Sequence, residues 1–200
     1  MTGLARLTTG YAPPSLSEEW ISTMGLARFL RFAVQGGRIL GRLTAAYGEA
    51  DAHYLASLAA AWNGCGFCGY GHALTGSLLW FRDHDRVHPL TVRQIERMMG
   101  LLDQESIVAL ESLLDAPPYR RLRRLSRRLF DLKMGHAAPE GAEDHLLMAT
   151  VLLWTWSIEC TITLGMTLDP EQAQPYMHRI YKDRRLRERY ERARRAAETA

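Results

Sequence analysis

Apolar side chains recur along almost the whole chain with the spacing of three to four residues that is typical of amphipathic helices. No run of alternating or β-branched residues is long enough to suggest a strand. Proline, glycine and Asn-Gly breaks separate the apolar stretches. The pattern predicts an all-α fold, a compact multi-helix bundle in one domain over 1–200, with helices over about 18–34, 39–47, 49–62, 65–81, 91–99, 103–114, 119–134, 143–164 and 171–198.

Several of these breaks predict where particular helices begin or end. Ser15 or Ser17 is expected to cap the first of these helices, and the Gly36-Gly37 pair is expected to stop it. Asn63-Gly64 suits a left-handed helix terminus and is expected to end the helix over 49–62. The polar segment 83–88 is expected to be a loop whose histidines, His84 and His88, are solvated.

The stretch 146–168 is apolar enough to raise the question of a membrane span. It contains Glu159 and five threonines, and His145 directly precedes it. Polar and ionisable groups of this kind are costly inside a bilayer. The sequence therefore favours a buried core helix, and no membrane partner is expected.

Two segments show a weak internal similarity at an offset of 92 residues. If 49–80 and 141–172 are two copies of one helical unit, the bundle has two related halves, although chance would also explain the five identities. In the second segment Cys65 becomes Ser157 and His72 becomes Leu164. Only the first segment would then carry thiol chemistry.

Composition and charge exclude several classes of protein. Hydrophobic residues make up 47% of the chain and charged ones 24%, as in an ordinary folded domain. A net charge of +3 does not favour nucleic-acid binding. Six arginines between Arg120 and Arg128 alternate with leucines, which indicates a surface or subunit-contact face of an amphipathic helix. The N-terminus lacks the apolar core of a signal peptide, and three cysteines are too few for a disulfide framework. We expect a cytoplasmic protein.

The informative segment is Asn63-Gly-Cys-Gly-Phe-Cys-Gly-Tyr-Gly-His72, in which Cys65, Cys68 and His72 follow a C-x-x-C-x-x-x-H spacing. Offsets of three, four and seven residues put all three side chains on one helical face. A helix that begins at Cys65 points its free N–H groups at that thiol and lowers its pKa. The pattern indicates a two-cysteine redox centre, with an imidazole one turn later to carry a proton.

Here the chain resembles the alkylhydroperoxidase D-like group of the carboxymuconolactone decarboxylase superfamily, over about residues 49–79. The resemblance implies an all-helical fold, a peroxidase or disulfide reductase cycle, and assembly into trimers or hexamers. The family's acidic residue falls on His53, which is a departure from the family pattern. Glu49 lies one helical turn before His53 and is the alternative source of a carboxylate.

The leading hypothesis is a thiol-dependent oxidoreductase whose catalytic residues are Cys65, Cys68, His72, His53 and Glu49. One thiolate attacks a small hydroperoxide, the other cysteine resolves the sulfenic acid to a disulfide, and a protein dithiol or lipoyl-type donor reduces it. Helix position favours Cys65 as the attacking thiol, whereas the spacing to His72 favours Cys68. No cofactor is expected.

Two alternatives remain open. In a non-enzymatic helical module Cys65, Cys68 and His72 would bind zinc, with His53 as a fourth ligand, or would only pack. A lactone decarboxylase activity is less favoured, because members of the superfamily with that activity typically lack the cysteine pair. Cys160 is interpreted as a small buried hydrophobic residue. Strongly apolar helices such as 146–164 favour a homo-oligomer.

Overall fold

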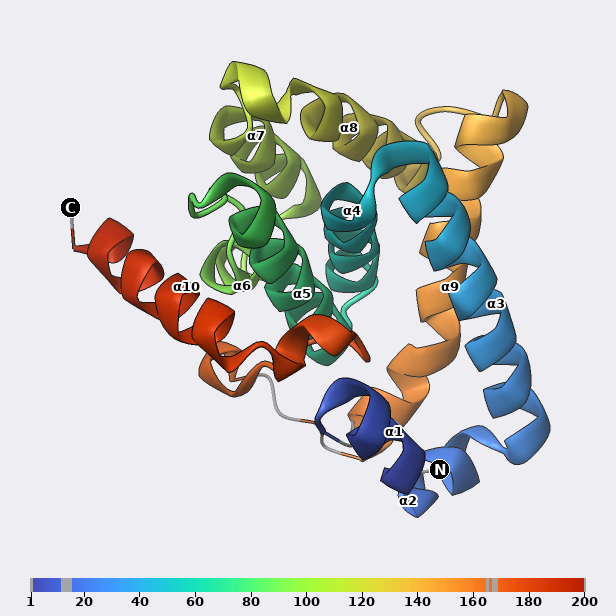
Figure 1. The fold of residues 1–200 in the computed structure, drawn as a ribbon. Helices are drawn as coiled ribbons and strands as arrows, with labels where there is room; N and C mark the ends of the chain where they lie inside the picture. The colour runs from blue at the N-terminus through green and yellow to red at the C-terminus, as the bar shows by residue number, and fades with distance from the viewer. Residues whose placement is uncertain (1, 12–15, 165, 167–168, 200) are drawn as a thin grey trace.

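The computed structural model describes residues 2–11, 16–164, 166 and 169–199 (Figure 1). These residues form helices joined by short loops and contain no strand, which confirms the all-α prediction. Ser15 lies outside the described residues, and Ser17 is the residue that caps α2. The α-helices are α1 Thr2–Thr9, α2 Glu18–Met24, α3 Leu26–Tyr47, α4 Glu49–Trp62, α5 Gly66–His84, α6 Val92–Met99, α7 Asp103–Leu113, α8 Arg120–Met134, α9 Gly141–Thr163 and α10 Arg184–Glu198.

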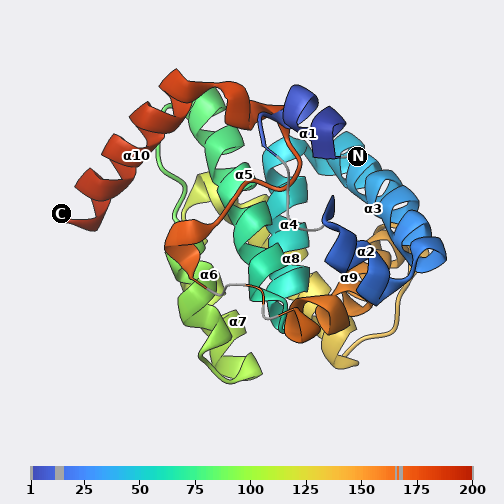
Figure 2. The same cartoon turned by 90° about the horizontal axis from the view of Figure 1, so that it is seen from below.

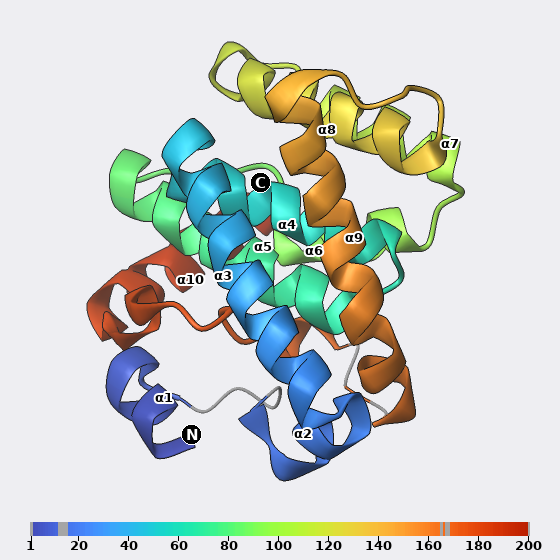
Figure 3. The ribbon, with the colours of Figure 1, turned by 90° about the vertical axis from the view of Figure 1, so that its right-hand side faces the viewer.

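Helices α4 and α5 form an antiparallel hairpin in the middle of the molecule (Figures 1 and 2). Helices α3 and α9 lie side by side along one flank of the hairpin, as Figure 3 shows most clearly. Helices α7 and α8 pack at one end, and α10 crosses the flank opposite α9 (Figure 1). The hairpin that carries the cysteine motif is therefore enclosed by the rest of the chain.

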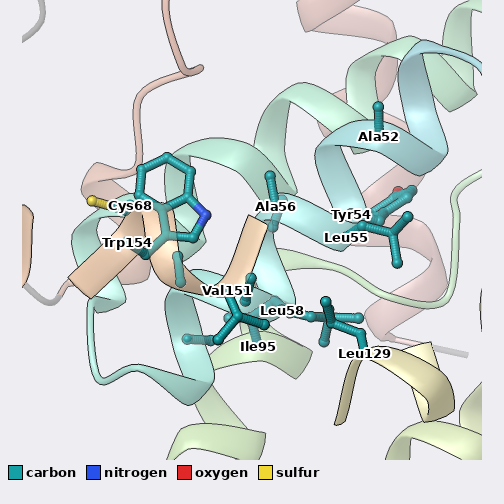
Figure 4. Packing of buried hydrophobic residues seen from close by; sticks show 14 of the residues in the cluster. Ala52, Tyr54, Leu55, Ala56, Leu58, Cys68, Ile95, Leu129, Val151 and Trp154 are labelled. Atoms are coloured by element: carbon teal, nitrogen blue, oxygen red, sulfur yellow. The ribbon is translucent and has the colours of Figure 1, made fainter. Parts of the chain in front are cut away.

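Residues 51–61 of α4 are buried on every side of the helix. A helix that is apolar all round belongs in a core, and α4 packs there against α5, α8 and α9 (Figure 4). Small residues allow this close approach. A Cβ added at Gly76 would lie 3.2 Å from the Tyr54 ring, and the Ser57 hydroxyl donates to the Gly69 carbonyl at 2.8 Å. Gly69 and Gly76 of α5 are thus explained by contact with α4.

The expected stop at Gly36-Gly37 is wrong, because α3 continues through this pair to Tyr47. The break lies earlier, at Gly25, whose φ of 80° is in the region that favours glycine. Two mid-helix glycines each weaken a helix by about 1 kcal/mol relative to alanine. Packing of α3 against α4 and α9 outweighs that local cost.

Helix α9 is the one helix in the described part of the chain that is long and apolar enough to cross a membrane. Half of its most apolar window is buried inside the protein, and core helices pass the same test of length and composition. Its inner face includes Leu147 and Trp154, whereas Leu152 and Ile162 are exposed.

The expected terminal helix over 171–198 is shorter than predicted. Short 3-10 turns occupy Pro170–Gln172 and Arg179–Lys182, and α10 begins only at Arg184. The Asp183 carboxylate caps α10 by accepting from the Leu186 N–H at 2.9 Å. The loop over 173–178, which precedes the second 3-10 turn, runs along α5 and reaches the cysteine motif.

The arginine face of α8 pairs with carboxylates of the same chain. Arg121 binds Asp51 of α4, Arg124 binds Glu143 of α9, and other arginines bind Glu111 and Asp144. Burial raises the pKa of Asp51, and the Arg121 guanidinium opposes that rise. These ion pairs tie α8 to three neighbouring helices.

Candidate functional site

The cysteine pair lies at the start of α5, directly after the turn that ends α4. Gly64 has a φ of +83°, as the Asn63-Gly64 signal predicts, and the Cys65 N–H donates back to the Ala60 carbonyl at 2.9 Å. Cys65 is the N-cap of α5, and Cys68 lies in its first turn. Both side chains are reduced and buried, with exposed fractions of 1% and 3%.

The two thiols have opposite electrostatic environments. A hydrogen bond from the Cys68 thiol lowers the pKa of Cys65, although burial opposes it. Burial, followed by the interaction with Cys65, raises the pKa of Cys68 well above its ordinary value. Hydroxyls of α9 complete the surroundings, with Thr161 Oγ1 3.8 Å from the Cys65 sulfur and Ser157 Oγ 3.7 Å from the Cys68 sulfur. Cys65 is therefore the better thiolate, and Cys68 is the thiol that keeps its proton.

His53 of α4 and His72 of α5 form a buried histidine pair. Their Nδ1 atoms are 2.9 Å apart, so one ring donates and the other accepts. Burial lowers the pKa of His53 to about 3, and it also lowers the pKa of His72 well below the ordinary value. Both imidazoles are neutral at pH 7. The sequence hypothesis grouped these two residues but gave no reason for direct contact between them.

Glu49 does not join the cysteines. Its carboxylate lies at the surface, 3.3 Å from the Arg82 guanidinium and 3.8 Å from His178 Nε2. The His178 ring in turn packs edge-on against His53, with ring centroids 5.6 Å apart. Glu49 thus stands at the outer end of a row of histidines that leads inward through His178 and His53 to His72.

The loop over 173–178 supplies two residues that sequence reasoning missed, Tyr176 and His178. The Tyr176 ring stacks on His72 with centroids 4.0 Å apart. Its N–H donates to Thr75 Oγ1 at 2.8 Å, and a Cβ on Gly71 would come within 2.9 Å of the Gln174 carbonyl. No periodicity links this loop to a motif about 100 residues earlier, so the sequence held no signal for either residue.

A cavity of about 290 Å³ opens beside the histidine pair, between α3, α4, α9 and the 173–178 loop. His53, His72 and His178 line it, together with Trp154 and apolar side chains of α3. Neither Cys65 nor Cys68 is among the lining residues. A molecule in the cavity therefore touches the histidines before it can reach the thiols.

The remaining predicted residues have other surroundings. Cys160 is buried, and burial raises the pKa of its thiol, in keeping with its interpretation as a packing residue. His84 is exposed, but the expectation that His88 is solvated is wrong. His88 is 1% exposed and stacks on Tyr54, with ring centroids 4.2 Å apart.

Within the part of the chain that the structure describes, no group of three or more His, Cys, Asp or Glu side chains is arranged to hold a metal ion. The zinc alternative therefore lacks a ligand set in this geometry. Comparisons of the chain with protein-family models, curated proteins and solved structures give no match. The resemblance drawn from the sequence rests on its motif residues alone.

Proposed function

We propose that the protein is a thiol-dependent oxidoreductase that reduces small hydroperoxides, or the disulfide of a partner, through Cys65 and Cys68. One observation carries the proposal: two thiols lie within one helical turn and have opposite pKa shifts. A low-pKa thiol beside a high-pKa thiol is the arrangement needed for attack by one sulfur and resolution by the other. The motif resemblance to the alkylhydroperoxidase D-like group supports the same chemistry.

The reaction proceeds in two steps on the enzyme. The Cys65 thiolate attacks the terminal oxygen of the hydroperoxide, the O–O bond breaks, and the leaving alkoxide takes a proton to become an alcohol. The Cys68 thiol then attacks the Cys65 sulfenic acid, which forms a disulfide and releases water. The lowered pKa of Cys65 supports Cys65 as the attacking thiol, a choice that motif spacing leaves open.

A dithiol must return the two electrons. A protein dithiol or a lipoyl-type donor attacks the Cys65–Cys68 disulfide, becomes a disulfide itself, and leaves both cysteines reduced. This cycle suits a reducing compartment, which agrees with a cytoplasmic location. Because both sulfurs are buried, the exchange requires α5 or the 173–178 loop to move aside.

His72 is the proton carrier in this proposal. It lies one turn after Cys68 on α5, and its Nε2 is buried without a hydrogen-bond partner among the described residues. An imidazole that keeps its Nε2 proton can give it to the leaving alkoxide, and the contact with His53 Nδ1 supplies a replacement proton. His53 thus acts through His72 and does not reach the sulfur directly.

The proposal is tested by counting thiols before and after one equivalent of hydroperoxide. The wild-type chain should lose two titratable thiols, and mass spectrometry should show the loss of two hydrogens in the peptide that holds both cysteines. The Cys68→Ser variant should stop at a sulfenic acid on Cys65. The Cys65→Ser variant should not react at a comparable rate.

Cys160→Ser provides the matched control, because Cys160 is also a buried thiol but lies on α9 outside the pair. This variant should oxidise as the wild type does. Retention of all three thiols under peroxide would leave Cys65 and Cys68 as packing residues, and a linkage that contains Cys160 would also overturn the proposal. Tightly held zinc with no titratable thiols would favour the non-enzymatic module.

A further inference from the structure

The cavity beside the histidine pair is lined partly by apolar side chains and partly by histidines. One wall is apolar and comes mainly from α3, through Phe29, Phe32, Gly36 and Leu40. The opposite end carries the histidine pair and Trp154. At about 290 Å³, the cavity is about twice the size of the roughly 150 Å³ apolar cavity that holds one benzene, so it has room for one molecule of about ten non-hydrogen atoms.

Two nitrogens at the polar end lack hydrogen-bond partners among the described residues. They are His72 Nε2 and Trp154 Nε1, on side chains exposed by only 1% and 2%. The two rings meet edge-to-face with centroids 4.9 Å apart. In Figure 4 the indole nitrogen lies on the side of its ring toward Ala56, which also lines the cavity. A buried unpaired N–H costs about 1–3 kcal/mol, so an acceptor atom in the cavity would relieve a real penalty.

The acceptor must belong to an uncharged molecule. The described lining contains no Asp, Glu, Lys or Arg side chain. Burial keeps His53 and His72 neutral and also lowers the pKa of His178, the third histidine of the lining. An anionic head group would lose its hydration here without gaining a cation. A neutral hydroxyl, ether or carbonyl oxygen pairs with an N–H at a much lower desolvation cost.

The glycine pair of α3 explains how the cavity stays open. Gly36 and Gly37 both line it, in a helix that continues through them at a local cost in stability. A Cβ at Gly36 would meet only Leu153 side-chain atoms, at 3.6 Å and beyond, so a larger side chain is sterically allowed at its base. Space for a ligand, rather than close helix packing, accounts for glycine at this position.

We propose that this cavity is a binding site for uncharged, largely apolar molecules of about ten non-hydrogen atoms that carry one hydrogen-bonding oxygen, held by His72 and Trp154. The site shares His72 with the proposed thiol chemistry, but no cysteine lines it. Binding is therefore independent of whether Cys65 and Cys68 react.

The test is calorimetric titration of the full chain with three probes that share one skeleton: 3-phenyl-1-propanol, propylbenzene and 3-phenylpropanoate. The alcohol should bind at one site with a Kd of roughly 0.1–1 mM, the range expected for a ligand of this size. Propylbenzene, which has no oxygen, should bind about 10-fold more weakly. The carboxylate should bind at least 10-fold more weakly than the alcohol. The same order is expected in a Cys65→Ser/Cys68→Ser variant, which separates this site from the redox proposal.

Variants locate the site. Gly36→Leu fills the cavity and should weaken binding of the alcohol by 10-fold or more, whereas Gly41→Leu should leave binding within twofold. Gly41 is the matched control, because it lies on the same helix, outside the lining, and a Cβ there meets no described atom within 4 Å. Near-ultraviolet circular dichroism confirms that both variants are folded.

Trp154→Phe removes the indole N–H together with the five-membered part of the ring, and it should reduce the preference for the alcohol over propylbenzene, with His72 Nε2 left as the remaining donor. Three results would overturn the proposal: no saturable binding of the alcohol, equal affinity for the carboxylate, or unchanged affinity in a folded Gly36→Leu variant.

Discussion

Mild acid should destabilise this protein because three of its histidines are buried in the neutral form. His53, His72 and His88 are each at most 2% exposed. Burial lowers the pKa of His53 and of His88 from 6.5 to about 3, and it moves the pKa of His72 in the same direction. In the unfolded chain each returns to about 6.5, so between pH 6.5 and pH 3 the unfolded state binds more protons than the folded state.

The sign and the size follow from that difference. For a histidine whose folded pKa lies below the unfolded value, the stabilising contribution is complete above pH 6.5 and is lost as the pH falls. A pH of 5 is 1.5 units below the pKa of 6.5 that a histidine has in the unfolded chain. At 1.36 kcal/mol per unit, protonation of the unfolded state lowers the free energy of unfolding by about 2 kcal/mol per residue. His53 and His88 together cost about 4 kcal/mol and His72 adds to this in the same direction, against a total stability of roughly 5–15 kcal/mol for a typical domain.

The assay is urea unfolding, followed by circular dichroism, at several pH values from 7 down to 5. We expect the slope of unfolding free energy against pH to approach uptake of about three protons near pH 5. Two carboxylates with shifted pKa values act differently. The pKa of Asp144 is lowered to about 2 by its hydrogen bond with Arg128, so its stabilising contribution is lost only at lower pH. Burial raises the pKa of Asp51, so this group acts with the opposite sign to the buried histidines.

Single variants assign the protons. His88→Gln should lower the proton uptake by about one. Equal stability at pH 7 and pH 5, to within 1 kcal/mol, would refute the claim that these imidazoles are buried and neutral. A slope that a folded His88→Gln variant leaves unchanged would refute the assignment of a proton to His88.

Two further predictions concern the histidine pair and assembly. His53→Ala should slow peroxide-dependent thiol oxidation by about 10²-fold, as expected for loss of a positioned proton-transfer group, and His53→Glu should restore part of the rate. If stopped-flow measurements give His53→Ala the wild-type rate, His53 is only a packing residue. We also expect a homo-oligomer, since Leu26, Leu30 and Val34 form an exposed apolar stripe along α3. In sedimentation experiments the wild type should form an assembly, and Leu30→Lys should weaken that assembly because it places a charge on the stripe. A wild-type species of 22.7 kDa at all micromolar concentrations would rule out the homo-oligomer.

The sequence predicted most helices because each is specified by its own residues. Helix α4 ends at Trp62, as its Asn-Gly break indicates, and the amphipathic pattern of α8 gives Arg120–Met134 almost as predicted. The failures occur where tertiary contacts override local preference. Gly36-Gly37 would end an isolated helix, but in the protein α3 is held against α4 and α9 on both sides of the pair.

In the candidate site, too, the features set by local sequence were predictable and those set by tertiary contacts were not. Cys65, Cys68 and His72 share one helical face, and that face follows from spacing alone. The contact between His53 and His72 needs the α4–α5 hairpin, which the Asn-Gly turn only suggests. Tyr176 comes from a loop with no periodic signal, so only its packing on α5 reveals it.

The lowered pKa values also change what the histidine pair can do. A group with a pKa near 3 is a poor base at pH 7, so His53 cannot hold the thiol proton as an imidazolium ion. Two neutral imidazoles joined through Nδ1 can still pass a proton along the pair. His72 would release its Nε2 proton and accept the Nδ1 proton of His53. If His53 is then reprotonated at Nε2, neither ring gains a net charge. His178 and then Glu49 continue the row to the surface. In the proposed reaction, the Glu49 carboxylate would act from the far end of this row, and His53 would supply protons from solvent rather than store one.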